Sequence, residues 1–245
     1  MRAAILFLTV SILLASCTTR QGARELRLAV ASNFKAPAAA LVTRFEKRSG
    51  RIVTIALGST GKLYAQIDNG APFDVFLAAD AERPRLLEEK LQAANGTRFT
   101  YAVGKLVLWS PKEDGVDPEG AVLESGGFSR LAIANPSLAP YGKAAEEVLR
   151  KRGLWDKLRD RIVRGENIGQ TYQFVYSGNA EIGFVALSQV KDKSGSFWIV
   201  PQNLYTPIEQ QAVLLSGDGD ARRFLEYLKS DEARSIIRNY GYDLK

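Results

Sequence analysis

Apolar residues form eight short alternating or continuous stretches, and helical patterns lie between several of them. The first stretch, residues 25–31, alternates charged and apolar side chains, which is typical of a strand with one buried face. Strands and helices in alternation predict an α/β architecture with mainly parallel sheets. The other predicted strands are 52–57, 73–79, 105–109, 130–134, 183–187, 198–201 and 210–215.

Two long extended segments, residues 100–109 and 207–215, are predicted to be crossovers between two lobes. If the chain leaves the first lobe through one segment and returns through the other, the C-terminal part completes the first lobe. We therefore predict that residues 25–102 and 208–245 form lobe 1, and that residues 103–207 form lobe 2. Two such lobes close like a hinge on a ligand held between them.

The N-terminus has the features of an export signal. Arg2 precedes an apolar run that ends at Leu14, and this run is shorter than the roughly 20 residues that span a bilayer. It continues into Leu-Ala-Ser-Cys, which resembles a bacterial lipobox, a signal that is cut before its cysteine. We predict a signal peptide over 1–16, lipidation of Cys17, and a tether over 17–24; an ordinary signal peptide is the alternative. The mature protein is then a membrane-anchored lipoprotein of the periplasm or cell surface.

The amino-acid composition excludes several kinds of catalytic and metal-binding site. The chain has no histidine, and its one cysteine is assigned to the anchor, so the usual nucleophile–base pairs and the commonest zinc and copper ligands are absent. We expect no cofactor and no metal bound directly by protein side chains. The net charge is +6, but basic residues stand beside acidic ones, as in 44–48 and 146–151. Such mixed runs are typical of solvated helix faces, so no nucleic-acid partner is expected.

In four places a strand-like segment is followed by small polar residues or glycine that open a helix. A helix N-terminus presents unpaired backbone N–H groups and the positive end of the helix dipole, which together attract anions. Parallel sheets bring such loops to a common edge. For any one loop alone, ordinary N-capping is the alternative. The four loops are 31–33, 58–61, 139–142 and 166–169.

The side chains in these loops are neutral hydrogen-bond donors. No Asp or Glu lies in the proposed cores of the loops, so nothing is placed to accept a proton from a ligand. This favours a fully deprotonated dianion over hydrogen phosphate. The hydroxyl and amide hydrogens come from Ser32, Asn33, Ser59, Thr60 and Tyr141.

Two other functions are weaker alternatives. Carboxylate-based hydrolysis of an anionic substrate would use Asp74 and Asp80, although both are expected to cap and hydrogen-bond neighbouring loops. An iron site would use tyrosines, but two of the candidates, Tyr172 and Tyr176, stand at helical spacing and are expected to pack. The other candidates are Tyr205, Tyr240 and Tyr242.

Five motifs are spread over most of the mature sequence, at 29–34, 70–80, 135–136, 183–187 and 240–242. Together they resemble the molybdate-binding receptors of bacterial ABC importers. The resemblance implies a two-lobed type II periplasmic-binding fold, in which two crossover strands join mainly parallel sheets flanked by helices. It also implies a protein that binds molybdate or tungstate and has a membrane permease as its partner, and we expect this protein to be a monomer. A receptor for sulfate or another oxyanion stays open as the alternative.

The resemblance also implies which residues contact the oxyanion. One branch of the family has a tyrosine where this sequence has Ala186, so Tyr141 is expected to supply the phenol from the second lobe instead. The full implied set is Ser32, Asn33, Thr60 with Ser59 beside it, Tyr141, and the backbone N–H of Ile168.

Overall fold

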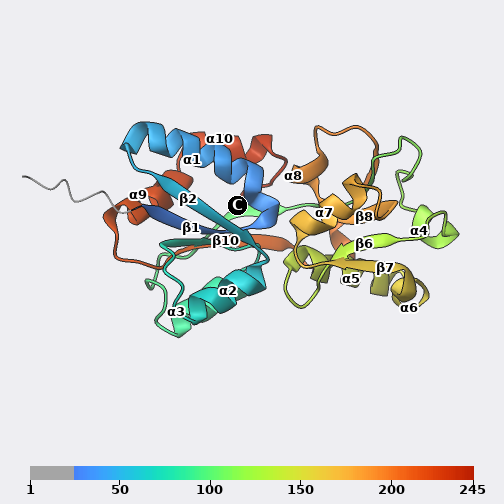
Figure 1. Cartoon of the computed structure of the whole chain (residues 1–245), viewed down its shortest axis with the longest axis horizontal. Helices are drawn as coiled ribbons and strands as arrows, with labels where there is room; N and C mark the ends of the chain where they lie inside the picture. The colour runs from blue at the N-terminus through green and yellow to red at the C-terminus, as the bar shows by residue number, and fades with distance from the viewer. Residues whose placement is uncertain (1–24) are drawn as a thin grey trace, which may run out of the picture.

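The computed structural model describes residues 25–245 and places them in two lobes, each built on one five-stranded sheet (Figure 1). The predicted signal peptide, Cys17 and the tether lie outside the described residues. The lobe 1 sheet has the order β2 (Val53–Gly58), β1 (Leu26–Ala31), β3 (Val75–Leu77), β10 (Ile208–Leu214), β4 (Phe99–Gly104). The lobe 2 sheet has the order β7 (Ile162–Gly165), β6 (Leu131–Ala134), β8 (Ile182–Ala186), β5 (Leu106–Ser110), β9 (Ser196–Ile199).

In each sheet four strands run in one direction and one runs against them. The reversed strand is β10 in lobe 1 and β5 in lobe 2, and both pair antiparallel with their two neighbours. The reason lies in the connections, because each of these strands follows a passage from the other lobe. The four other strands end at the cleft, whereas a strand that enters from the cleft must begin there.

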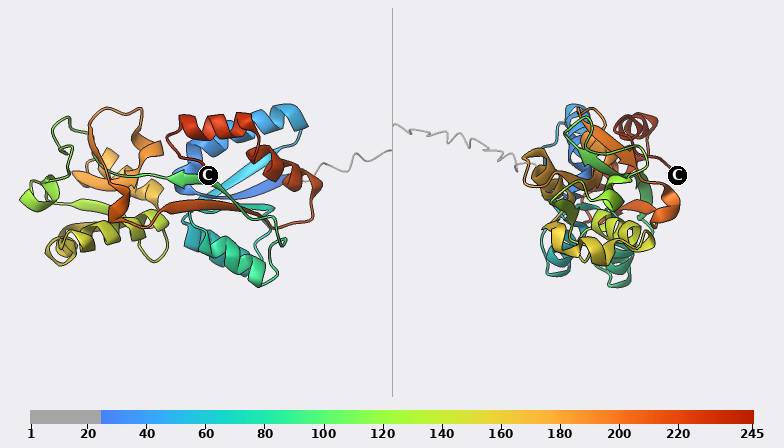
Figure 2. Two further views of the ribbon diagram at one scale, coloured as in Figure 1. Left: turned by 180° about the vertical axis from the view of Figure 1, so that it is seen from behind. Right: turned by 90° about the vertical axis from the view of Figure 1, so that its right-hand side faces the viewer.

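The chain passes between the lobes twice. Lys105 alone separates β4 of lobe 1 from β5 of lobe 2, and the return runs from β9 to β10. Figure 2 shows β10 from behind, running along lobe 1 from the junction. The lobe boundaries expected after residues 102 and 207 stay a prediction.

Helices cover both faces of each sheet. In lobe 1, α1, α9 and α10 pack on one face and α2 and α3 on the other; in lobe 2, α5 and α6 lie opposite α7 and α8. Within residues 25–245, none of the helices has the length and apolar content to cross a membrane. The helices are η1 (Ser32–Phe34), α1 (Lys35–Ser49), α2 (Thr60–Asp68), α3 (Glu82–Glu89), α4 (Val122–Ser125), α5 (Pro140–Lys151), α6 (Trp155–Leu158), η2 (Arg159–Arg161), α7 (Ile168–Tyr176), α8 (Leu187–Val190), η3 (Gln202–Leu204), α9 (Gly219–Leu228) and α10 (Asp231–Asn239).

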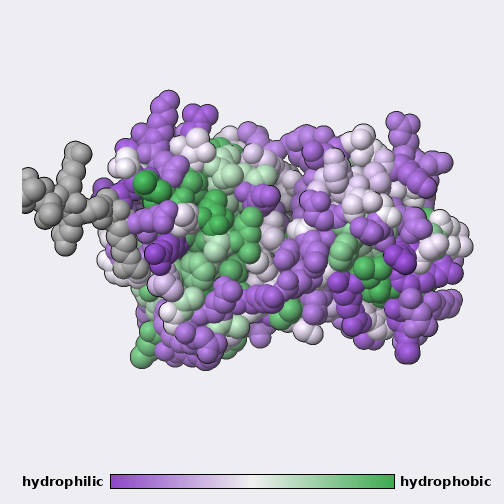
Figure 3. Space-filling view, viewed as in Figure 1, coloured by the Kyte–Doolittle hydropathy of each residue, from purple (hydrophilic) through white to green (hydrophobic). Residues whose placement is uncertain are grey.

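Strand β2 forms one edge of the lobe 1 sheet and leaves apolar surface uncovered. Figure 3 shows this apolar surface on the front of lobe 1, in the region of β2. Leu57 in β2 is 42% exposed, and Ile52, just before the strand, is 67% exposed. The buried side of the same sheet is continuous, with Leu28 and Val30 of β1 fully covered by helices.

The segment after the second crossover returns to the core of lobe 1. Helix α9 begins after Asp218, whose side chain accepts backbone N–H groups of the first turn. Phe224 of this helix is fully buried, and its ring packs edge-on against Phe45 of α1 with centroids 5.1 Å apart. The first and last parts of the described chain therefore share one core.

We expect Phe224→Ala to lower the free energy of unfolding by about 3–5 kcal/mol, because it removes a buried aromatic ring and leaves a cavity. Phe197→Ala is the matched control, since Phe197 on β9 is 38% exposed; it should cost about 1 kcal/mol or less. Urea unfolding of both variants measures the difference. Equal losses would contradict the central packing role of α9.

Candidate functional site

Four helices begin at the cleft between the lobes, and the residues at their starts meet in one narrow pocket. The pocket encloses about 10 Å³, close to the room that one water needs. A tetrahedral oxyanion is larger, so it enters only if the lining groups move apart. All six residues expected to contact a ligand line this pocket, which consists of Ser32, Asn33, Ser59, Thr60, Tyr141 and Ile168 with Ala31, Gly58, Ala79, Ala139 and Pro140.

Ser59 and Thr60 stand where β2 passes into α2. The Ser59 hydroxyl oxygen caps the helix by accepting the Lys62 N–H at 3.3 Å. The Thr60 hydroxyl oxygen accepts the Ala79 N–H at 3.0 Å. Capping uses the oxygens and leaves each hydroxyl hydrogen for another acceptor, so N-capping and anion binding are compatible at this loop.

Tyr141 and Ile168 come from the two helix starts of lobe 2. Pro140 is the first residue of α5, a position where a helix has no use for a backbone N–H, and Tyr141 follows it. Asn167 caps α7 by accepting the Gln170 N–H at 3.0 Å, which makes Ile168 the first helical residue. The Ile168 N–H has no partner within the helix and lies at the positive end of the dipole.

Ser32 and Asn33 follow β1 in the short helix η1. The Ser32 hydroxyl donates across the cleft to Oδ1 of Asn167 at 3.1 Å. The Asn33 amide donates to Oε1 of Gln210 at 2.9 Å and to the phenol oxygen of Tyr242 at 3.0 Å. The Asn33 side chain therefore has its amide hydrogens engaged within the protein, and its backbone N–H at the start of η1 is the donor that remains.

The phenol of Tyr141 reaches from lobe 2 to the strand β10. The side chain is 1% exposed, and its oxygen accepts a hydrogen bond from Nε2 of Gln210 at 3.3 Å. Burial, helped by the nearby phenols of Tyr242, Tyr205 and Tyr101, holds the pKa of Tyr141 well above its usual range. The phenol therefore stays protonated at neutral pH and keeps a hydrogen to donate.

The electrostatics of the pocket depend on dipoles rather than on charged side chains. Its lining contains hydroxyl, amide and apolar groups, and neither acidic nor basic side chains are among the described residues that form it. The helix starts supply partial positive charge. Such a site can hold an anion by hydrogen bonds, and its described lining places no carboxylate, amine or imidazole beside the hydroxyl groups to activate them as nucleophiles.

The lobes contact each other around the pocket. The Gly61 N–H at the start of α2 donates to the Leu138 carbonyl of lobe 2 at 2.9 Å. Lys62, which follows in α2, forms an ion pair with Glu166 of lobe 2. Both side chains of this pair are about half exposed at the surface of the cleft. These contacts join the two lobes across the cleft.

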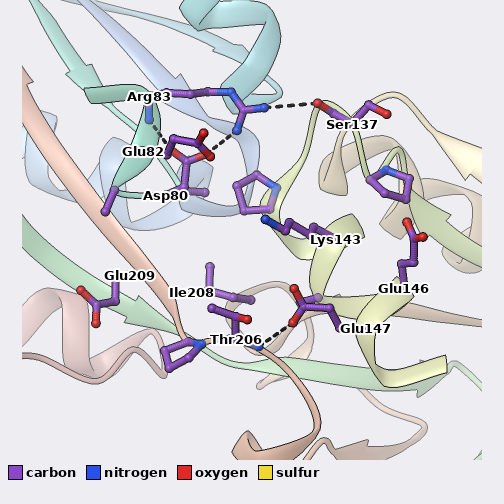
Figure 4. Close-up of a pocket in the computed structure, with 16 residues that line it drawn as sticks. Asp80, Glu82, Arg83, Ser137, Lys143, Glu146, Glu147, Thr206, Ile208 and Glu209 are labelled. Atoms are coloured by element: carbon purple, nitrogen blue, oxygen red, sulfur yellow. Dashed lines mark hydrogen bonds and ion pairs between the residues drawn. The ribbon is translucent and has the colours of Figure 1, made fainter. Parts of the chain in front are cut away.

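A second and larger cavity, about 660 Å³, lies beside the pocket and shares Ala79 and Pro140 with it (Figure 4). Negative charge predominates around this cavity, which makes it a poor place for a dianion. Most of the carboxylates already have partners, among them Glu147, which accepts the Thr206 N–H. The charged residues lining it are Asp80, Glu82, Arg83, Lys143, Glu146, Glu147 and Glu209.

Asp74 and Asp80, the residues considered for hydrolysis, hold the local structure together. Asp74 accepts the Arg27 N–H at 2.8 Å, which ties β3 to β1. Asp80 accepts the Arg83 N–H at 3.0 Å and pairs with its guanidinium. Burial raises the pKa of Asp80, although Arg83 acts in the opposite direction.

Two of the tyrosines considered for an iron site, Tyr172 and Tyr176, pack away from the pocket, whereas Tyr242 bonds to the pocket residue Asn33. Tyr172 stacks between Trp109 and Tyr176, with centroids 5.5 and 5.6 Å away. Ala186, which has no side-chain donor, is fully buried at the end of β8. Tyr141 is thus the tyrosine that lines the pocket.

Sequence reasoning missed a buried polar network beneath the pocket. Gln210, on β10, hydrogen-bonds with Asn33, Tyr101 and Tyr141, residues far from it in the sequence. Tyr242 joins the network through Asn33. The available signal was the pair of adjacent glutamines that follows Glu209 in strand β10, which suggests a polar role but does not say which residue has it.

The chain is similar in sequence and in structure to known binding proteins. It is 50% identical to the molybdate-binding protein ModA of Azotobacter vinelandii over 91% of each chain. It is also 50% identical to the ModA of Rhodobacter capsulatus, over 90% of this chain and 88% of that one. The solved structure of the Azotobacter vinelandii periplasmic molybdate-binding protein superposes with a TM-score of 0.87 and 43% identity, covering 90% of this chain and 99% of that one.

A family model described as bacterial extracellular solute-binding protein matches residues 26–243, which is nearly all of the described chain. The two-lobed type II periplasmic-binding fold agrees with that match. The protein belongs to the family of bacterial extracellular solute-binding proteins.

Proposed function

We propose that this protein captures molybdate or tungstate as a tetrahedral oxyanion between its lobes and delivers it to the membrane permease of an ABC importer. The observation that carries the proposal is the convergence of four helix starts on one pocket lined by neutral donors. The names of the half-identical relatives support molybdate as the ligand. The contacting residues are Ser32, Asn33, Ser59, Thr60, Tyr141 and Ile168.

The chemistry of the donors favours a dianion that carries no proton. Hydroxyl hydrogens come from Ser59, Thr60 and Tyr141, and a helix N–H comes from Ile168. Hydrogen phosphate would bring its own O–H into a pocket without a carboxylate to accept it, and an unsatisfied buried donor costs about 1–3 kcal/mol. Among dianions that carry no proton, the size of the pocket determines which one binds, because the Mo–O and W–O bonds of molybdate and tungstate are longer than the S–O bonds of sulfate.

Capture works by closure, and no bond is made or broken. The anion enters an open cleft. Donors of lobe 1 bind it, either before the donors of lobe 2 or at the same time. Closure then forms the contacts seen across the cleft, such as Gly61 with Leu138. The closed arrangement presents the two lobes in the fixed orientation that a permease recognises.

We also propose that the mature protein is a monomer in the periplasm or at the cell surface, held to the membrane by a lipid on Cys17. The single cysteine after a short apolar run supports this location. Delivery to a membrane permease is then a local event, because the tether keeps the receptor at the surface where the permease lies.

Calorimetric titration of the mature protein with molybdate, tungstate, sulfate and phosphate tests the proposed ligand. We expect one-to-one binding of molybdate or tungstate, far tighter than binding of phosphate. Affinity should change little between about pH 6 and 8, since the reference pKa values of the donors lie outside that range and burial moves the pKa of Tyr141 further above it. Equal or tighter binding of phosphate would refute the proposal, and tighter binding of sulfate would reassign the ligand.

Tyr141→Phe removes one hydrogen bond to the anion and leaves the ring in place. A neutral donor to a charged acceptor is worth roughly 1.5–3 kcal/mol, so molybdate affinity should fall about 10- to 150-fold. The free energy of unfolding should also fall, by about 1–3 kcal/mol, because phenylalanine leaves Nε2 of Gln210 without its acceptor. Tyr172→Phe, which removes a phenol that stacks outside the pocket, is the control and should bind as the wild type does.

Unaltered molybdate affinity would give Tyr141 a purely structural role. In that case Tyr141→Phe would lose stability, because Gln210 loses its acceptor, but would bind molybdate as the wild type does. The phenol contact would then have to be assigned to another residue.

Cys17→Ser tests the anchor. We expect the variant either to leave the membrane fraction or to accumulate unprocessed, because serine cannot take the thioether-linked lipid. Fractionation of cells and mass spectrometry of the mature N-terminus measure both outcomes. A wild-type protein that is wholly soluble, with an unmodified N-terminus, would remove the claim.

A further inference from the structure

Gln210 is a fully buried amide at the centre of the junction between the lobes. It lies on β10, the strand that follows the second crossover, and its side chain has no exposure to solvent. A buried amide is stable only if its oxygen and its NH2 group find partners. The partners of Gln210 therefore determine which way the amide points.

The oxygen of this amide is fixed by Asn33 of lobe 1, whose Nδ2 donates to Oε1 of Gln210 at 2.9 Å. The phenol of Tyr101 also lies 3.1 Å from this oxygen, but its one hydrogen is shared with the Ala78 carbonyl, which is at the same distance. A flipped amide would set the NH2 group of Gln210 against the NH2 group of Asn33. The oxygen consequently faces lobe 1, and Nε2 faces the phenol oxygen of Tyr141 at 3.3 Å.

This arrangement fixes the direction of the Tyr141 hydroxyl. A phenol has one hydrogen to donate and accepts through its oxygen. Because Gln210 donates to the oxygen, the hydrogen of Tyr141 must point away from Gln210. Two acceptors are then within reach of that hydrogen: the phenol oxygen of Tyr242, with which Tyr141 shares a hydrogen bond, and an anion in the pocket, which Tyr141 lines.

The first crossover strand leaves space for this contact. Gly104 ends β4, and a Cβ atom at that position would lie 2.1 Å from the phenol oxygen of Tyr141 and 2.7 Å from Nε2 of Gln210. Any other residue would collide with both groups. The tip of Tyr141 is therefore held between the two crossover strands, with Gly104 on one and Gln210 on the other.

We propose that Gln210 is a positioning residue for oxyanion binding: by donating to the phenol oxygen, it turns the Tyr141 hydroxyl into a donor aimed at the ligand. This inference rests on the proposed function. Gln210 itself does not touch the anion, since it is absent from the pocket lining. Its effect on affinity passes through Tyr141.

A double-mutant cycle on molybdate affinity tests this relay. In the wild type, Tyr141→Phe should weaken binding about 10- to 150-fold. In a Gln210→Met background, which removes the amide donor at similar volume, the same change should weaken binding by about threefold or less, because the phenol is no longer aimed at the anion. Gln210→Met alone should weaken binding by about tenfold.

Gln211→Met is the matched control. Gln211 is the next residue of β10, but its side chain bonds with Arg98 and Thr100 on the outer side of lobe 1. We expect this variant to lose some thermal stability and to show the full Tyr141→Phe effect. If Gln210→Met does not fold, Gln210→Glu serves instead, since its second oxygen accepts the Tyr141 hydrogen and should equally abolish the Tyr141→Phe effect.

The outcomes separate this inference from the proposed function. A wild-type protein that binds neither molybdate nor tungstate refutes the proposed function. A wild-type protein that binds molybdate, with independent effects of the Gln210 and Tyr141 substitutions, refutes the positioning role alone. Loss of stability without coupling in affinity counts as the second outcome.

Discussion

The unpaired backbone N–H groups at helix starts are the constraint on which this molecule depends. Four helices begin at the cleft, and the groups of their first turns have no partner inside the helix. Side-chain caps from Ser59 and Asn167 satisfy only part of them. The uncapped N–H groups are donors that belong partly to lobe 1 and partly to lobe 2. An anion that accepts hydrogen bonds from both sets therefore holds the lobes together. Binding and closure are therefore one event in this architecture.

Local patterns predicted most of the fold. Short apolar stretches predicted eight of the ten strands at the right places, because buried strands in α/β proteins are apolar on both faces. The first crossover, expected as one segment, is two strands that Lys105 separates. Strand β7 (Ile162–Gly165) was missed, since its exposed Arg164 and short length hide the pattern. The direction of the reversed strands β5 and β10 depends on how the chain connects the lobes, and local sequence patterns carry no information about those connections.

The candidate site divides in the same way. Loop residues such as Ser59 and Tyr141 were predictable because helix starts have a sequence signature, and the structure brings them into one pocket. The amide partners of Asn33 were not predictable, because Gln210 lies 177 residues away. A glutamine in a strand carries no sign of what it will face. Contacts between residues so far apart in the sequence depend on how the two lobes meet, which is a property of the whole fold.

The missing side chain at Gly104 has a consequence for engineering. The ring that is expected to contact the ligand ends in the space between the two strands that connect the lobes. A substitution at position 141 that is made to change the preferred anion therefore also changes the packing between these strands. A designer who builds an anion sensor from this receptor has to choose the residues at positions 104 and 141 together, because each sets the room that is left for the other.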